Sequence, residues 1–130
     1  MKPVLQLALD FLNLQRALRV AKEAMRGGVD WIEAGTPLVK SEGLNSVREL
    51  RRLFPKATIV ADMKIMDVGR IEAEAAAKAG ANIIAVLAVA PDSTIKECVL
   101  AGKNYGAKIE ADLIGVKDVD IGRRAGELEA

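Results

Sequence analysis

Five short apolar segments alternate with five longer amphipathic segments along the chain, and this alternation constrains its fold more than any other feature. The apolar segments have strand character and cover 4–9, 29–34, 58–62, 82–88 and 108–114. Helices are expected over 14–27, 43–54, 70–79, 92–105 and 119–129. Glycine recurs between a helix and the next strand, at Gly27, Gly80 and Gly106. The repeat predicts an α/β protein with parallel strands joined by right-handed crossovers.

Two architectures have this repeat: a doubly wound open sheet and part of a (β/α)8 barrel. A closed barrel has eight strands and about 200 or more residues, whereas this chain has 130 residues and five visible units. We expect one domain over 1–130, a partial TIM (β/α)8 barrel of about five βα units that lacks strands six to eight. Its two edge strands would be open to pairing, so self-association is expected.

Composition excludes several classes of function. Nineteen basic and eighteen acidic residues give a net charge of +1 without a basic cluster, so we expect no nucleic-acid partner. The chain has no histidine, which excludes Ser-His catalysis and His-ligated zinc. No apolar segment is long enough for a membrane span. Cys98 is the single cysteine; we expect a half-buried structural thiol and a cytoplasmic location.

Acidic residues stand at or near the ends of four expected strands: Asp10, Glu33, Asp62 and Asp112. In both architectures ligands bind at this edge of the sheet. Converging carboxylates need a counter-charge. Lys64 follows Asp62 by two residues, so an extended strand would point both side chains to one face. A divalent cation, with Mg²⁺ as the best match to carboxylate oxygens, is the second candidate.

The segment 61–69, Ala-Asp-Met-Lys-Ile-Met-Asp-Val-Gly, resembles the signature of the orotidine 5′-monophosphate decarboxylase suprafamily. Within it, the segments 7–10, 31–38, 40–43 and 92–95 (Leu-Ala-Leu-Asp, Trp-Ile-Glu-Ala-Gly-Thr-Pro-Leu, Lys-Ser-Glu-Gly and Asp-Ser-Thr-Ile) resemble the 3-hexulose-6-phosphate synthase family most closely. The similarity extends from about residue 3 to about residue 116.

This resemblance implies a role for each matching residue. Glu33 and Asp62 would bind Mg²⁺. Asp10 and Lys64 would position substrate hydroxyls and assist proton transfer, and Asp112 would contact the sugar. The implied reaction is a reversible aldol step between formaldehyde and ribulose 5-phosphate, which gives a 3-hexulose 6-phosphate.

In relatives of this type, the residue that matches Asp67 enters the active site of the neighbouring subunit, which implies a homodimer. Relatives also take an acid/base histidine from strand six and bind phosphate after strands seven and eight, elements that this sequence is expected to lack. Thr36, Lys40 and Ser41 follow the second strand and are weaker candidates for substrate contact.

Three alternatives remain. A 3-keto-L-gulonate 6-phosphate decarboxylase would share Glu33, Asp62, Lys64 and Asp67. A catalytically silent half-barrel would fold and self-associate without turnover. A phosphoacceptor receiver domain also has five βα units, but it needs a lysine at the end of strand five, where this chain has Asp112.

Overall fold

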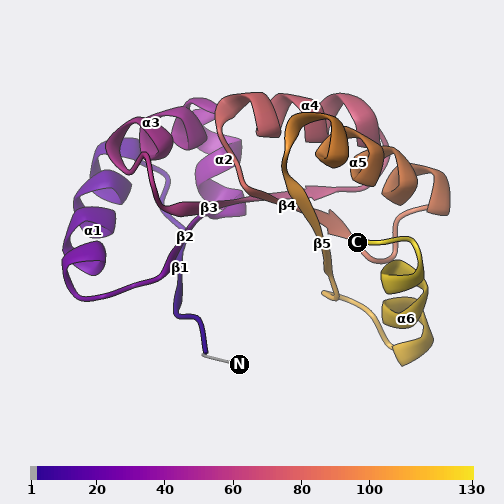
Figure 1. The fold of residues 1–130 in the computed structure, drawn as a ribbon. Helices are drawn as coiled ribbons and strands as arrows, with labels where there is room; N and C mark the ends of the chain where they lie inside the picture. Colours follow the sequence, from indigo (N-terminus) through magenta and orange to yellow (C-terminus); the bar gives the residue numbers. More distant parts are fainter. Residues whose placement is uncertain (1–2) are drawn as a thin grey trace.

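The computed structural model describes residues 3–130 as one five-stranded parallel sheet with six helices (Figure 1). The strands are β1 (Gln6–Leu9), β2 (Trp31–Ala34), β3 (Thr58–Ile65), β4 (Ile83–Leu87) and β5 (Lys108–Asp112). The helices are α1 (Leu14–Arg26), α2 (Thr36–Glu42), α3 (Asn45–Leu53), α4 (Gly69–Ala79), α5 (Asp92–Tyr105) and α6 (Val119–Glu127). The strands lie in the order β1-β2-β3-β4-β5. This order confirms the partial barrel, because a doubly wound sheet reverses its strand order in the middle.

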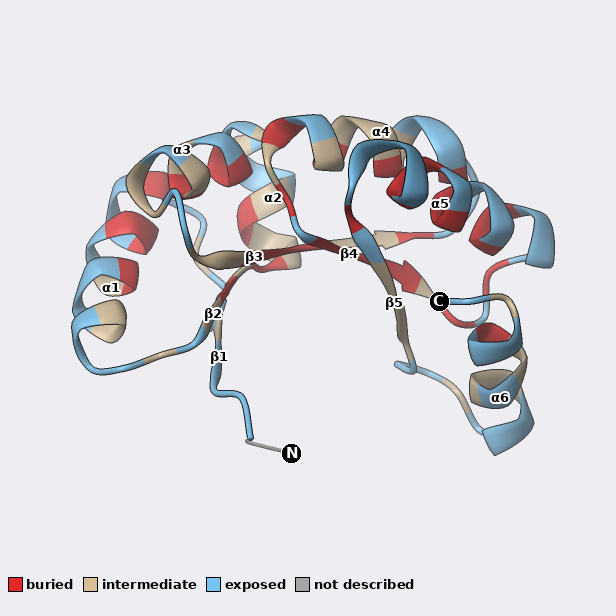
Figure 2. Cartoon of the chain, in the orientation of Figure 1, coloured by how far each residue is buried: buried red, intermediate tan, exposed pale blue. Residues whose placement is uncertain are grey.

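The sheet is curved like an arch, with helices α1 to α5 on its convex side and α6 beyond the end of β5 (Figure 1). Side chains alternate between the two faces: Ile32 and Ala34 are buried towards the helices, whereas Trp31 and Glu33 are only partly buried. Figure 2 shows the buried residues gathered between the sheet and the helices. The largest buried side chains are those of Leu9, Ile32, Leu38, Leu50, Ile59, Ile65, Ile84 and Ile95. Within residues 3–130, no helical layer covers the concave side.

The expected helix over 43–54 corresponds to α3 (Asn45–Leu53), but the sequence did not predict the separate helix α2 (Thr36–Glu42). Gly35 is extended before α2, and Pro37 lies in its first turn, where a missing N–H removes no helical hydrogen bond. Gly43 has φ +63 and ends α2 before α3 begins. In the described part of the chain no helix is both long and apolar enough to cross a membrane.

Strands β1 and β5 are the two edges of the sheet. The Lys108 amide donates to the carbonyl oxygen of Asn82, the residue before β4. The Asp112 carbonyl oxygen accepts from the amide of Ala88, the residue after β4. Residues of a parallel strand alternate in the neighbour that they face. The backbone groups of Ile109 and Ala111 therefore point away from β4, towards the open edge.

Candidate active site

Lys64 links two strands that are not neighbours. Its Nζ donates to Asp112 Oδ2 at 2.6 Å and to Asp62 Oδ1 at 3.1 Å, so it joins β3 to β5. Burial disfavours the ammonium, but the hydrogen bonds to the two carboxylates outweigh it, and the pKa of Lys64 is raised. Burial also disfavours ionised Asp112, but Lys64 and the Ile114 amide together lower the pKa of Asp112. The three groups form a charged network at the carboxyl edge of the sheet.

The backbone at Lys64 differs from the extended strand that we expected. Lys64 has φ +47, in the left-handed region. The register of β3 on β4 shifts between Ala61 and Ile65, which pair with Ile84 and Val86, so β3 carries two more residues than its neighbour there. Asp62 and Lys64 do meet, but this bulge brings them together rather than simple strand alternation.

A residue that follows β2 also holds Asp62 in place. Thr36, the first residue of α2, has its Oγ1 2.5 Å from Asp62 Oδ2 and 3.1 Å from the Asp62 carbonyl oxygen. The hydroxyl of Thr36 is therefore used within the protein and not displayed for substrate. Ser41 likewise donates to the Leu12 carbonyl, at 2.7 Å. Lys40 is exposed on α2.

Glu33 lies on β2, beside this network. Gln6 of β1 donates from Nε2 to Glu33 Oε2 at 2.6 Å. Burial raises the pKa of Glu33, and the Gln6 hydrogen bond opposes this shift. The negative charges of Asp62 and Asp10 add to the effect of burial, and the pKa of Glu33 ends above its ordinary value. Glu33 is thus electrostatically coupled to three of the other predicted site residues, because the positive charge of Lys64 also acts on it, in the lowering direction.

Asp10 follows β1 and packs against Gly35. A Cβ atom at position 35 would lie 2.0 Å from Asp10 Oδ1 and 3.0 Å from the Leu9 carbonyl oxygen. No side chain can occupy that space without moving Asp10. Gly35 therefore makes room for the carboxylate, a role that the sequence did not reveal.

Glu110 belongs to the same acidic group, although sequence reasoning missed it. It is partly buried on β5, two residues before Asp112 and therefore on the same face. Burial raises the pKa of Glu110, and the charges of Glu33, Asp62 and Asp112 raise it further. Alternate residues of a strand share a face, so the segment Lys-Ile-Glu-Ala-Asp, which ends on the predicted site residue Asp112, contained the signal for Glu110.

Asp67 lies outside the Lys64 network. Its Oδ1 accepts a hydrogen bond from the Val68 amide at 2.8 Å, and its carbonyl oxygen accepts one from Thr94 Oγ1 at 3.1 Å. Asp67 is exposed, and exposed Met66, Val68 and Ile71 surround it in the sequence. The Asp67 carboxylate thus lies on the surface, next in sequence to exposed apolar residues.

The donor set fits a hard divalent cation with few protein ligands. Glu33 and Asp62 offer carboxylate oxygens from neighbouring strands, and Glu33 uses Oε2 for Gln6. Within residues 3–130, no three Asp, Glu or Cys side chains are grouped so that they alone could hold a metal ion. Mg²⁺ needs no such cage, because it is usually held by one or two carboxylates together with water and substrate oxygens.

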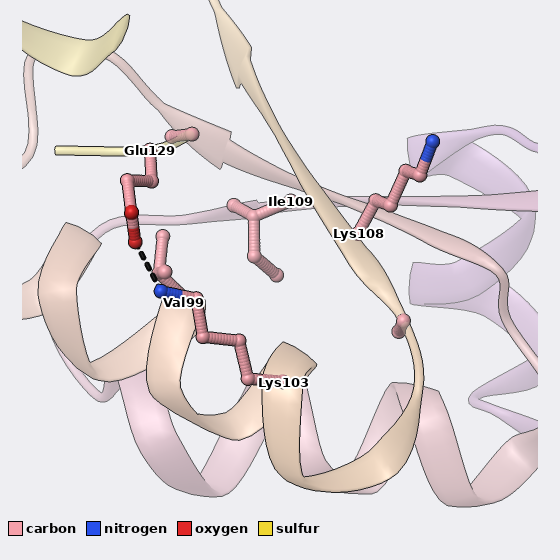
Figure 3. Close-up of a pocket in the computed structure, with 7 residues that line it drawn as sticks. Val99, Lys103, Lys108, Ile109 and Glu129 are labelled. Atoms are coloured by element: carbon pink, nitrogen blue, oxygen red, sulfur yellow. Dashed lines mark hydrogen bonds and ion pairs between the residues drawn. The ribbon is translucent and has the colours of Figure 1, made fainter. Parts of the chain in front are cut away.

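Two other features are separate from this group. Cys98 is completely buried, so the expectation of a half-buried thiol is wrong, and burial raises its pKa to about 12. A cavity of about 350 Å³ lies between α5 and β5, on the helix side of the sheet. Figure 3 shows it lined by Val99 and Ile109, with Lys103 and Glu129 paired at its side. None of the carboxylates coupled to Lys64 lines it.

Solved structures with the same fold cover nearly all of this chain. A crystal structure of 3-hexulose-6-phosphate synthase aligns with TM-score 0.95 and 40% identity, over 98% of this chain and 62% of that one. The 3-keto-L-gulonate-6-phosphate decarboxylase of Vibrio cholerae O1 biovar El Tor aligns with TM-score 0.93 and 35% identity, over 98% of this chain and 59% of that one.

Sequence comparison gives the same relationship. The 3-hexulose-6-phosphate synthase of Bacillus subtilis (strain 168) is 44% identical over 126 residues, which are 97% of this chain and 59% of the relative. That of Mycobacterium gastri is 42% identical over 114 residues, 88% of this chain and 55% of the relative. The chain thus spans somewhat more than half the length of these relatives. The model of the "Orotidine 5'-phosphate decarboxylase / HUMPS family" matches residues 3–126, and the chain belongs to this family.

Proposed function

We propose that this chain carries the metal-binding and acid/base half of a Mg²⁺-dependent aldol enzyme that joins formaldehyde to ribulose 5-phosphate and cleaves the 3-hexulose 6-phosphate product. The observation that carries the proposal is the contact of Lys64 with both Asp62 and Asp112, beside Glu33, at the carboxyl edge of the sheet. Ligands of parallel (β/α) folds bind at this edge. The names of the related synthases supply the substrate class.

Each residue has a distinct task in this proposal. Glu33 and Asp62 hold the cation, which when bound supplies positive charge next to a developing oxyanion. Asp112 and Asp10 orient sugar hydroxyls, Asp10 from the end of β1. Lys64 holds Asp62 and Asp112 in place and donates hydrogen bonds to the substrate oxygens between them.

The chemistry of the proposed reaction explains why the candidate site contains more carboxylates than lysines. Formaldehyde has no enolisable carbon, so the sugar phosphate must become the nucleophile by losing a proton from carbon. A carboxylate close to the substrate accepts that proton, and a nearby ammonium or cation limits the charge that develops. Asp10 and Lys64 are the pair that we assign to this step.

We also propose that the chain acts as a homodimer or larger assembly in the cytoplasm. Met66, Val68 and Ile71 are 45%, 44% and 60% exposed around Asp67, an apolar surface that a second copy can cover. Burial of these side chains would bring Asp67 to the partner protomer. The single cysteine is a buried, free thiol, which suits a reducing compartment.

A decarboxylase acting on 3-keto-L-gulonate 6-phosphate is the second candidate, because solved decarboxylases align with TM-scores of 0.93 and 0.91. Both reactions need a stabilised enediolate and differ in the group that is lost or added. Release of CO₂ from the keto acid distinguishes them from formaldehyde-dependent consumption of ribulose 5-phosphate.

The test measures formaldehyde-dependent loss of ribulose 5-phosphate with Mg²⁺, first with the chain alone and then with a C-terminal segment of a related synthase added. Turnover that requires Mg²⁺ and is lost in Glu33→Gln supports the aldol proposal. A folded chain that shows no turnover in either case, and no CO₂ release, is a silent half-barrel, and the enzymatic proposal then fails.

A further inference from the structure

Gln6 is the one neutral side chain that contacts Glu33 through a hydrogen bond in the described structure. Gln6 pairs in register with Trp31, and Ala8 pairs with Glu33. The Gln6 side chain therefore reaches diagonally along the face of the sheet to Glu33 Oε2, at 2.6 Å. Diagonal neighbours on adjacent strands are about 7–8 Å apart at their Cα atoms, a span that suits a long side chain.

The chemistry of the amide fits a supporting role. Only its NH₂ group can donate to a carboxylate, which fixes the orientation of the amide. The bond occupies Oε2 and leaves Oε1 of Glu33 for another partner. Since the amide is neutral, it restrains the carboxylate without neutralising it, whereas a lysine at this position would compete with a cation.

We propose that Gln6 is a positioning residue that orients Glu33 for a divalent cation. This inference rests on the proposed function, in which Glu33 binds the metal. Partners that orient a metal-binding side chain contribute typically about 10–100-fold to metal affinity. Gln6 is exposed on β1, so we expect it to contribute about 10-fold to metal affinity, the lower end of that range.

The experiment measures binding of Mn²⁺, as a paramagnetic probe for Mg²⁺, by the purified chain with electron paramagnetic resonance. Gln6→Leu removes the donor with little change in size. Gln15→Leu is the matched control, because Gln15 is an exposed glutamine on α1. Glu33→Gln tests the metal site itself, and thermal unfolding of all four proteins without metal reports whether the fold is kept.

The expected result is loss of Mn²⁺ binding in Glu33→Gln, weaker binding by about 10-fold in Gln6→Leu, and no change in Gln15→Leu, with similar melting temperatures. Unchanged affinity in Gln6→Leu beside loss in Glu33→Gln overturns the role of Gln6 and leaves the metal site intact. Unchanged affinity in Glu33→Gln overturns the metal site and the role of Gln6 together. If Gln6→Leu lowers affinity only in proportion to a fall in melting temperature, the role is structural and the inference fails.

Discussion

Lys64 Nζ lies 2.6 Å from Asp112 Oδ2, and this contact spans from β3 to β5 over the intervening β4. The reach depends on the bulge in β3, which lifts Lys64 out of the regular strand. Opposite charges thus link two non-adjacent strands where the candidate site lies. The backbone at Lys64 adopts a conformation that glycine prefers, φ +47.

The left-handed backbone at Lys64 predicts that the glycine and alanine variants rank in opposite order of stability at Lys64 and at Lys78. Lys64→Gly should be more stable than Lys64→Ala by about 1 kcal/mol, because glycine has no Cβ penalty in the left-handed region. In α4 the order should reverse: Lys78→Ala should be more stable than Lys78→Gly by about 1 kcal/mol. Urea denaturation of the four variants checks this. Equal stability of the two variants at position 64 would contradict a strained backbone.

Gly35 should be intolerant of the smallest side chain. Gly35→Ala places a Cβ 2.0 Å from Asp10 Oδ1, so we expect a loss of about 1–3 kcal/mol from the free energy of unfolding. Gly126→Ala is the control, because a Cβ there meets nothing within 4 Å in α6, and it should stabilise by about 0.5–1 kcal/mol.

The double variant Gly35→Ala with Asp10→Ala separates the clash with the carboxylate from other effects. Removal of the Asp10 side chain should recover part of the stability lost in Gly35→Ala. The Leu9 carbonyl, at 3.0 Å, accounts for the remainder. Strict additivity of the two changes would show that the Asp10 contact does not determine the cost.

Cys98 should make stability fall at alkaline pH. Its folded pKa of about 12 lies above the unfolded value of about 8.5. A raised folded pKa contributes stability that is complete below the unfolded pKa and is lost as pH rises towards the folded pKa. The difference in unfolding free energy between the wild type and Cys98→Ala, measured from pH 8 to 11, should therefore shrink as pH rises. A constant difference would contradict the buried thiol, as would rapid labelling by a disulfide reagent at pH 8.

The open edge of β5 should mediate part of any self-association. Ala111→Pro removes an N–H that points away from β4, so the fold should survive while pairing with another chain is blocked. Glu110→Pro removes an N–H that faces β4 and should unfold the strand. Light scattering during gel filtration gives the masses. A wild-type assembly that persists unchanged in Ala111→Pro would assign association to another surface.

The repeat of apolar and helical segments was enough to predict the five units. The glycines Gly80 and Gly106 marked the helix ends correctly, because each ends its helix in the left-handed conformation. Helix α2 was missed because it has only seven residues, and because Gly35, which precedes it, and its first residues Thr36 and Pro37 are typical of a loop. Local composition carries little information on so short a helix.

Strand ends alone predicted the position of Asp112, the last residue of β5, whereas Asp62 was expected to end its strand and lies inside β3 (Thr58–Ile65). Contacts between distant segments were not predictable in the same way. Whether Thr36 faces substrate or Asp62 depends on the entry angle of α2, and the space beside Asp10 depends on how closely Gly35 approaches. These are properties of packing between segments, which periodicity does not encode.

The uncovered concave side of the sheet also bears on the fate of a reactive carbanion. Solvent that reaches Glu33 and Asp10 from that side also reaches a substrate carbon held between them. In the proposed reaction, proton transfer from water to that carbon would then compete with its addition to formaldehyde. Under the proposed function, selectivity for the aldol outcome would therefore depend on what covers this face as well as on the charged groups that the five strands supply.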